Sequence, residues 1–307
     1  MTIRYDGKVA IVTGAGGGLG RAHALGLAAR GAKVVVNDLG AESDGVGSSS
    51  VRAESVVEEI KIAGGEAVAN GANVGKLDEV EAMVKDVMDT WGRVDILINN
   101  AGILRDSSFA KDTIENFRTV VEVHLMGTLN CTKTVWGIMR EQSYGRILMT
   151  TSSSGLYGNF GQTNYGSAKM AVVGMMNSLV HEGAKYNIKI NAVAPCAGTR
   201  MTEGLIKGEA FDLIRPEAVT PGVLYLVSED GPNRTIMSAG AGVFAVAKIY
   251  ESDGVWLPEE EQTPEGVAAH WDAISDMSEK EALQSAFDQS FKFIGKAADA
   301  LGINLGG

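Results

Sequence analysis

Three polar residues in one stretch of the chain have the types and spacing needed to move a proton to or from an alcohol oxygen. A short apolar run at 147–149 predicts a buried strand, and Ser152 stands just after it. A glycine-rich loop then leads into a predicted helix that carries Tyr165 and Lys169 one turn apart on one face. A phenol titrates near pH ~10 in water, so a neighbouring ammonium that favours the phenolate makes it a usable acid-base group. Ser152 is placed to hydrogen-bond the same oxygen.

A Tyr-x-x-x-Lys pair alone is weak evidence because a chain of this composition often contains one by chance. Whether this pair is catalytic is therefore judged from the surrounding elements. The first of them is a strand at 8–13 that runs directly into a glycine-rich turn and a helix. Glycine is needed where the backbone turns with positive φ, and where no Cβ can stand between backbone amides and a pyrophosphate at a helix N-terminus. The residues expected to bind a dinucleotide at this turn are Gly14, Gly18, Leu19 and Gly20.

The next predicted strand, at 33–37, ends in Asp38. A carboxylate at this place can accept hydrogen bonds from the adenosine ribose hydroxyls and would repel a 2′-phosphate. Arg21 and Arg52 are the nearby residues that could compensate such a phosphate, but neither directly follows Asp38. The predicted cofactor is therefore NAD.

The rest of the pattern alternates strands with helices. Strands are expected at 67–69, 94–98 and 188–193, and helices at 51–62, 80–91, 114–142 and 164–186. This alternation predicts an α/β fold of Rossmann type, a doubly wound parallel sheet with helices on both faces and a helical C-terminal extension. Such sheets bind ligands outside the carboxyl ends of their strands. The residues expected to flank the cofactor there are Asn73, Val74, Asn99, Ala101 and Gly102.

The composition argues against several other classes of protein. The 307 residues carry a formal net charge of −11 without a run of Lys or Arg, so neither nucleic acid nor an anionic membrane surface is expected as a partner. No apolar run is long enough for a membrane span, and we see no secretory signal pattern. Cys131 and Cys196 are expected to be buried thiols rather than a disulfide, and the four histidines lack metal-ligand spacing. We therefore expect a cytoplasmic protein without a metal site.

The chain is expected to form a dinucleotide-binding and catalytic domain at 1–250 and a helical extension at 251–307. A helix-start signal lies at 263–265, and Ser278 with Glu281 is expected to cap a second helix. These helices dock either on their own sheet or on a neighbouring subunit.

Together, the motifs resemble those of the short-chain dehydrogenase/reductase family. The stretch TGAGGGLG at 13–20, NNAG at 99–102, then Ser152, Tyr165 and Lys169 stand in that family's order and approximate spacing. The resemblance implies a single Rossmann-type domain that assembles as a homodimer or homotetramer. It also implies that Tyr165 is the general acid or base and that Lys169 binds the nicotinamide ribose and lowers the phenol pKa. Ser152 would orient the substrate oxygen.

Four further stretches resemble one subgroup of that family, the dehydrogenase units of peroxisomal multifunctional enzymes. They are NDLG at 37–40, NNAGILRD at 99–106, YGNFGQ at 157–162 and AGTRMT at 197–202. This subgroup oxidises (3R)-hydroxyacyl-CoA and includes a 17β-hydroxysteroid dehydrogenase. Because the chain ends in LGG, without a peroxisomal address, we expect a bacterial-type enzyme.

Two positions depart from the wider family pattern. His124 stands on a helix where most members have asparagine, and it is either part of a proton relay or a core histidine. After Pro195 the loop is one residue shorter than usual. Thr199 is expected to reach the nicotinamide carboxamide from this loop, and Ala197 and Gly198 are also expected to bind the cofactor.

Two segments bear on substrate and partners. The segment at 200–216 is apolar and resembles the family's substrate loop, which suits a fatty chain or a steroid. The helix at 164–186 is apolar nearly all round, which indicates a subunit interface.

Three functions therefore compete. The first is NAD-dependent oxidation of a secondary alcohol on a (3R)-hydroxyacyl-CoA or a hydroxysteroid, with neither substrate preferred. The second is a 3-oxoacyl reductase of the same fold. The third is a non-catalytic cofactor-binding protein, which fold alone never excludes, although the intact Ser152, Tyr165 and Lys169 count against it.

Overall fold

The computed structural model describes residues 2–42, 44, 45, 47, 49–198 and 208–305, and the chain divides into two compact units, 1–246 and 247–307. The first unit holds the sheet and the motifs expected to bind the cofactor and carry out proton transfer. The second holds the C-terminal helices. The predicted division into a catalytic domain at 1–250 and an extension at 251–307 stays a prediction.

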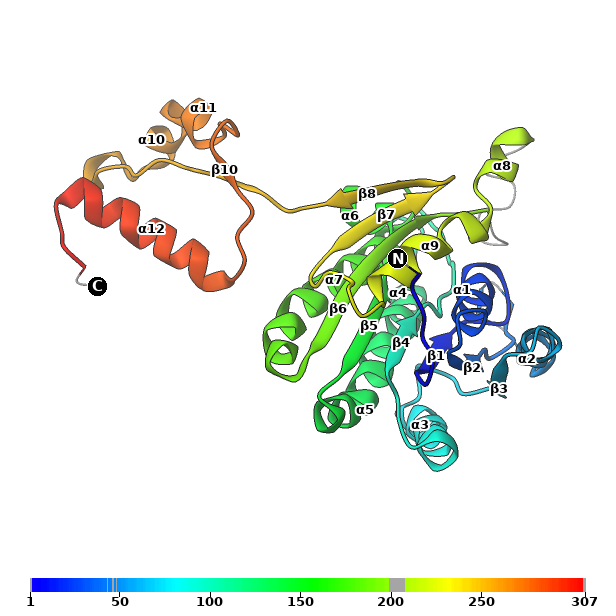
Figure 1. Cartoon of the computed structure of the whole chain (residues 1–307). Coiled ribbons are helices and arrows are strands. Elements are labelled where there is room, and N and C mark those ends of the chain that lie inside the picture. The colour runs from blue at the N-terminus through cyan, green and yellow to red at the C-terminus, as the bar shows by residue number, and fades with distance from the viewer. Residues whose placement is uncertain (1, 43, 46, 48, 199–207, 306–307) are drawn as a thin grey trace. The chain divides into compact units, whose positions relative to one another are not determined.

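The first unit is built on one eight-stranded sheet with the order β3-β2-β1-β4-β5-β6-β7-β8 (Figure 1). The strands are β1 (Val9–Thr13), β2 (Lys33–Asn37), β3 (Glu66–Asn70), β4 (Ile96–Asn99), β5 (Gly145–Thr150), β6 (Ile188–Cys196), β7 (Ile236–Gly240) and β8 (Val243–Ala247). Pairings from β3 through β7 are parallel. Only two residues, Ala241 and Gly242, both with positive φ, join β7 to β8, and so short a link fits an antiparallel hairpin.

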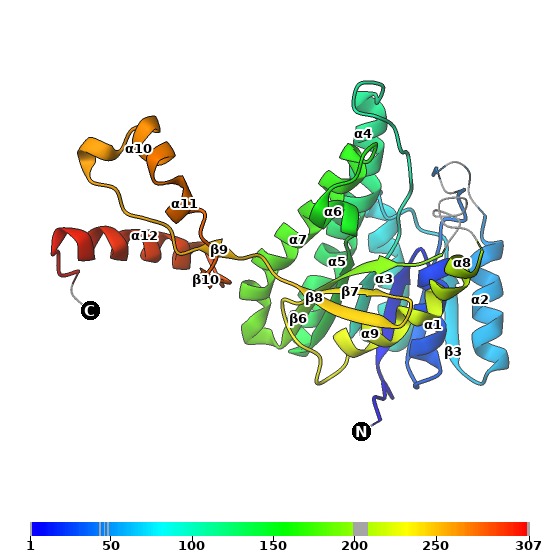
Figure 2. The ribbon, with the colours of Figure 1, turned by 90° about the horizontal axis from the view of Figure 1, so that it is seen from above.

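Helices cover both faces of this sheet (Figures 1 and 2). The helices α1 (Gly18–Ala28), α2 (Val51–Ile62) and α9 (Thr220–Leu226) pack together on one face, and α3 (Leu77–Trp91), α4 (Ile114–Val121), α5 (Gly127–Gln142) and α7 (Thr163–Gly183) on the other. Because both faces are covered, β1, β4 and most of β5 are buried along their length, which explains the apolar runs within them. The predicted doubly wound α/β fold is confirmed.

The helices predicted over 114–142 are α4 and α5, joined by a turn that the sequence pattern does not show. Between α4 and α5 lies a π-helical turn, η1 (Glu122–Met126), which includes His124. Alternation and apolar spacing do not reveal such a turn, because the segment stays helical on both sides of it. The helix predicted at 164–186 ends in a 3₁₀ turn, η2 (Ala184–Tyr186). Its role in a subunit interface stays a prediction.

The second unit contains α10 (Pro264–Ala269), α11 (Trp271–Ile274) and α12 (Ala286–Leu301), so the helical extension is confirmed. Thr263 caps α10 by accepting from the amide of Gly266, as predicted. The predicted capping box of Ser278 with Glu281 is wrong. Lys280–Glu281 forms a short strand, β10, that pairs with β9 (Glu251–Ser252), and Ser278 bonds to Asp276 instead.

The capping box belongs to the next matching sequence, seven residues later. The Ser285 side chain accepts from the amide of Asp288, and the Asp288 carboxylate accepts from the amide of Ser285, at the start of α12. Both Ser-x-x-acid sequences fit the motif, but only this one is followed directly by the apolar run of the helix.

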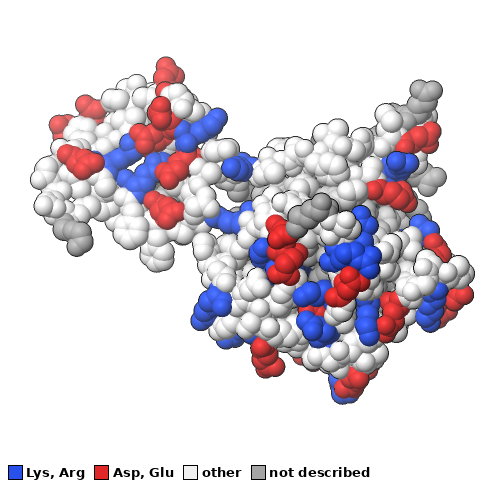
Figure 3. All heavy atoms as spheres, in the orientation of Figure 1, with Lys and Arg blue, Asp and Glu red and all other residues white. Residues whose placement is uncertain are grey.

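The surface shows no separation of charges on the face in Figure 3, where Lys and Arg are interspersed with Asp and Glu. No helix in the described part of the chain is long and apolar enough to cross a membrane. The two cysteines carry free thiols; Cys131 is buried as expected, but Cys196, at the end of β6, is exposed.

One buried hydroxyl fixes the helix that carries Tyr165 and Lys169 to the end of β5. Thr151 is fully buried, and its Oγ1 donates to the backbone oxygen of Lys169 over 2.6 Å. Because this hydrogen bond joins the end of β5 to α7, it sets the distance of Tyr165 and Lys169 from the sheet.

We expect Thr151→Val, which keeps the shape and removes the donor, to lower the free energy of unfolding by about 1–2 kcal/mol, the usual cost of a lost buried hydrogen bond. Urea denaturation followed by circular dichroism measures the change. The control is Thr134→Val, whose half-buried hydroxyl also donates to a helix carbonyl, that of Asn130. Equal losses in the two variants would contradict a special role for Thr151.

Candidate active site

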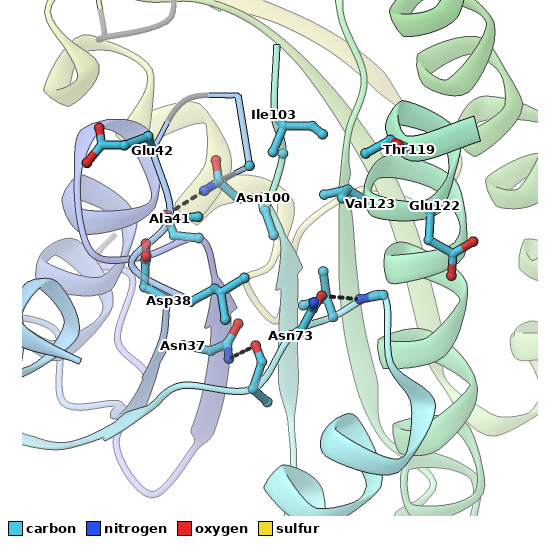
Figure 4. A pocket seen from close by; sticks show the side chains of 18 of the residues that line it. Asn37, Asp38, Ala41, Glu42, Asn73, Asn100, Ile103, Thr119, Glu122 and Val123 are labelled. Carbon is cyan, nitrogen blue, oxygen red and sulfur yellow. Dashed lines mark hydrogen bonds between the residues drawn. The ribbon is translucent and has the colours of Figure 1, made fainter. Parts of the chain in front are cut away.

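A cavity of about 690 Å³ opens at the carboxyl ends of β1, β2, β3 and β4. Figure 4 shows Asp38, Ala41 and Glu42 on one side of it and Thr119 and Glu122 on the other. The predicted cofactor residues that line it are Gly14, Gly18, Leu19, Asp38, Asn73, Val74, Ala101 and Gly102. The fold therefore gathers residues from four separate motifs around one crevice.

The glycine turn needs its glycines because the backbone passes too close to its neighbours for a side chain. Gly14 has φ +63°, and a Cβ there would lie 2.8 Å from the Cα of Ala101. A Cβ at Gly20 would lie 2.2 Å from the backbone oxygen of Gly14. With side chains excluded, the N-terminus of α1 is open to the crevice at Gly17 and Gly18, as a pyrophosphate requires.

A residue that the sequence reasoning missed joins this turn to the end of β4. The side-chain nitrogen of Asn100 donates to the backbone oxygens of Thr13 and Gly14, each over 3.0 Å. Asn100 lines the cavity, whereas the predicted Asn99 is 4% exposed and donates to Thr132 behind it. Successive side chains of an extended strand point to opposite sides, so the alternation in Asn99-Asn100 is the signal that only one of the two amides reaches the crevice.

Asp38 is held by backbone amides at the rim of the cavity. Its Oδ2 accepts from Gly16 and its Oδ1 from Gly40, each over 2.7 Å. Both arginines considered as compensating charges pair with other carboxylates. Arg21 forms an ion pair with Glu59.

Arg52 is held in the same region by the loop that follows Asp38. It donates to the backbone oxygen of Ala41 over 2.7 Å and to Glu42 Oε1 over 2.8 Å. Glu42 also lines the cavity, so this side of the crevice carries two carboxylates and one guanidinium.

Asn73 and Val74, which follow the end of β3, line the cavity. The Asn73 side-chain oxygen accepts from the amide of Gly75, drawn in Figure 4, and the backbone oxygen of Val74 accepts from Asn130 on α5, each over 2.9 Å. Their positions are therefore fixed by the protein itself.

The three residues proposed for proton transfer lie together where β5 meets α7. Ser152 is 9% exposed, and its side chain lies near enough to the phenol of Tyr165 to favour the phenolate. Lys169 is 4% exposed; its Nζ donates to the backbone oxygen of Thr150 over 2.7 Å and lies 5.6 Å from the centroid of the Tyr165 ring. Sequence spacing thus led to three side chains that the fold places together.

Burial opposes charge on both titrating groups. It raises the pKa of Tyr165, an effect that the nearby Ser152 side chain counteracts and the negative charge of Asp106 adds to. Burial also lowers the pKa of Lys169 to about 7. The protein's own groups therefore keep the phenol protonated at neutral pH, and the predicted lowering of its pKa by Lys169 stays a prediction for the complex with cofactor.

His124 lies directly against this cluster. It is 1% exposed, its Nε2 is 3.0 Å from the backbone nitrogen of Ile103, and its ring meets the ring of Tyr165 edge to face at 5.0 Å. Burial and the charge of Lys169 keep the pKa of His124 well below its usual value, so the imidazole is neutral. Gly102 makes room for it, because a Cβ there would lie 2.4 Å from His124 Cε1.

The loop after β6 is only partly described. Ala197 and Gly198 lie at the end of β6, where the amide of Gly198 donates to the backbone oxygen of Ile214. Thr199 and the apolar residues at 201, 205 and 206 fall outside the described residues. In the described part of the chain, no group of three or more His, Cys, Asp or Glu side chains could hold a metal ion.

Residues 8–210 match the family model of short chain dehydrogenases, and the chain belongs to this family. It is 46% identical over 279 residues to peroxisomal multifunctional enzyme type 2 of Mus musculus, covering 90% of this chain but only 38% of that enzyme. A short-chain type dehydrogenase/reductase of Mycobacterium tuberculosis is 46% identical over 88% of this chain and 95% of its own length. A 3-oxoacyl-[acyl-carrier-protein] reductase of Synechocystis is 41% identical over 72% of this chain and 90% of its own length.

Solved structures agree with this assignment. Full-length peroxisomal multifunctional enzyme type 2 from Drosophila melanogaster superposes with a TM-score of 0.80 at 36% identity, covering 97% of this chain and 51% of that one. A 7α-hydroxysteroid dehydrogenase in complex with NADH and 7-oxo glycochenodeoxycholic acid has a TM-score of 0.70 at 29% identity, covering 78% of this chain and 95% of that one. The chain is therefore an oxidoreductase of the short-chain dehydrogenase family, and it resembles the dehydrogenase part of the multifunctional enzymes.

Proposed function

We propose that this protein oxidises a secondary alcohol to a ketone with NAD, and that the alcohol is a (3R)-hydroxyacyl-CoA or a hydroxysteroid. The observation that carries the proposal is the meeting of Ser152, Tyr165 and Lys169 at the end of β5, beside a crevice shaped by glycines for a dinucleotide. The similarity to multifunctional enzymes and to a hydroxysteroid dehydrogenase supports the substrate classes.

Each residue has a distinct task in this reaction. Ser152 holds the alcohol oxygen close to the phenol, and Tyr165 takes the hydroxyl proton as the carbon loses hydride. The Nζ of Lys169 donates to the Thr150 carbonyl, and it is also placed to bind ribose hydroxyls. Oxidised nicotinamide bound here would supply a hydride acceptor and a positive charge. Because burial and Asp106 raise the pKa of Tyr165, a positive charge beside the phenol would favour the phenolate and let Tyr165 act as a base near neutral pH.

The residues of the crevice fit NAD better than NADP. The Asp38 carboxylate stands beside the glycine turn, and Glu42 on the same side forms an ion pair with Arg52. Arg21 and Arg52, the two guanidinium groups within reach in sequence, already pair with Glu59 and Glu42. A 2′-phosphate brings about −1.5 to −2 charges into this surrounding.

A second candidate is reduction of a 3-oxoacyl group by the same residues, with Tyr165 donating the proton. The similarity to a 3-oxoacyl reductase favours it. The homodimer or homotetramer and the cytoplasmic location expected from the sequence belong to the proposal as well.

We expect turnover with (3R)-hydroxyacyl-CoA or a hydroxysteroid and NAD, and poor turnover with sugars and polyols. Absorbance of reduced nicotinamide measures it across a panel of acyl-CoA and steroid alcohols, with the corresponding ketones and NADH testing the reverse direction. A comparable catalytic efficiency with a short polar alcohol would contradict the proposed substrate class.

We expect Tyr165→Phe to lower turnover by ~10² or more, the usual contribution of a positioned acid-base group, while NAD binding stays nearly intact. Steady-state kinetics and calorimetric titration of NAD measure the two effects. The control is Tyr157→Phe, an exposed tyrosine at the end of α6 (Ser153–Tyr157), which should leave both unchanged. Wild-type turnover in Tyr165→Phe would rule out this mechanism.

We expect a preference for NAD over NADP of ~10²-fold or more, because each pair of like charges about 4 Å apart costs about 4 kcal/mol at an effective dielectric of ~20, before relaxation. Asp38→Ala should reduce the preference for NAD over NADP. Glu54→Ala, which removes an exposed carboxylate on α2, should leave this preference unchanged. The ratio of kcat/KM with the two cofactors measures it. Equal efficiencies in the unmutated protein would show that Asp38 does not face the ribose.

A further inference from the structure

A chain of hydrogen bonds runs from the loop after β4 to the residues that carry out proton transfer. Gln162 is 9% exposed and immediately precedes α7. Its Nε2 donates to Asp106 Oδ2 over 2.8 Å, and its Oε1 accepts from Ser154 Oγ over 2.6 Å and from Asn159 over 3.0 Å. The amide of Ser154 in turn donates to Ser152 Oγ over 3.2 Å. Asp106 is thus connected to Ser152 through the Gln162 side chain and through Ser154, whose hydroxyl bonds to Gln162 and whose backbone amide bonds to Ser152.

Asp106 determines which way this amide faces. An ionised carboxylate only accepts hydrogen bonds, so Gln162 must present its NH₂ group to Asp106 and its carbonyl to Ser154. Reversed, the amide would set its oxygen against the carboxylate and its NH₂ group against that of Asn159, and would lose those two bonds. The backbone oxygen of Gln162 accepts from Gly166 in the first turn of α7, so the same residue fixes the start of the helix that carries Tyr165.

We propose that Asp106 and Gln162 are positioning residues for the reaction: Asp106 orients the Gln162 amide, and Gln162 holds Ser152 and Tyr165 in register. The proposal deepens the proposed function and rests on it. Neither residue touches the reacting atoms. Gln162 reaches Ser152 through Ser154, and Asp106 acts through Gln162 and through its charge.

The groups facing Tyr165 come from four elements. Lys169 lies one turn along α7, neutral His124 comes from η1, Ser152 from the end of β5, and Asp106 from the loop after β4. Of these only Asp106 contributes a negative charge, and it raises the pKa of Tyr165. Burial raises the pKa of Asp106 itself. Removing that charge should therefore make the phenol a stronger acid.

The charge and the hydrogen bond can be separated by substitution. Asp106→Asn keeps an acceptor for Gln162 and removes the charge, whereas Gln162→Leu breaks the chain and leaves the charge. The matched control is Asp112→Asn in the same loop, where the carboxylate accepts from Asn116 over 2.6 Å and from Asn164 over 3.1 Å. It loses the same charge but does not contact Gln162.

We expect Asp106→Asn to move the pH profile of kcat/KM for alcohol oxidation to lower pH by about half a unit, because the phenolate forms more readily. Asp112→Asn should keep the wild-type profile. Gln162→Leu should lower kcat by ~10-fold at the plateau of the profile, the effect of lost positioning, with the affinity for NAD from calorimetry unchanged. If Gln162→Leu folds poorly by circular dichroism, Ser154→Ala, which removes one link of the chain, should still lower kcat.

Two results would overturn the proposal. One is the same pH profile in Asp106→Asn as in the wild type, and the other is undiminished kcat in Gln162→Leu or, where that variant folds poorly, in Ser154→Ala. Failure of the proposed function looks different, because then Tyr165→Phe would keep its turnover. With Tyr165→Phe inactive and the Asp106 and Gln162 variants unaffected, only the positioning role is wrong.

Discussion

The close approach of two neighbouring strand ends governs the rest of this site. β1 and β4 pair in parallel, so both chains leave the sheet at the same edge and must turn past each other. The hydroxyl of Thr13 accepts from the amides of Asn100 and Ala101, each over 3.0 Å, and the Asn100 side chain bonds back to the glycine turn. A glycine at position 14 is what allows this contact, and the cavity for a dinucleotide lies beyond it.

Beside the crevice, the chemistry is dominated by the cost of burying charge. Burial pushes both Tyr165 and Lys169 toward their neutral forms, and the neighbouring His124 is neutral for the same reason. A cluster of this kind responds strongly to any charge brought next to it, because little water is present to screen that charge. Binding of a charged cofactor and ionisation of the phenol are therefore linked. Such a link suits a site in which Tyr165 should act as a base only when the cofactor is bound.

The sequence predicted the sheet and most of the crevice because those features are local. Apolar strands followed by glycines, Asp38 or an asparagine pair show in short windows, and β2 and α2 begin and end where the pattern placed them. The capping box was misplaced because two candidates seven residues apart satisfy the same rule. The link between Asp106 and Gln162 joins loops 56 residues apart and depends on how they fold over α7, which no short window records.

The π-helical turn that includes His124 changes how the whole of α5 faces the sheet. An α-helix rotates by about 100° per residue, and a π turn takes in one residue more than an α turn. Residues after η1 therefore point in directions that a continuous helix would give to their neighbours one position away. The inward facing of Cys131, Thr132 and Val135 depends on that extra residue, as does the ring of His124 against Tyr165. The turn η1 therefore acts as a phase shift in the helix. Loss of a single residue within it would shorten the helix only slightly but would change which residues of α5 are buried.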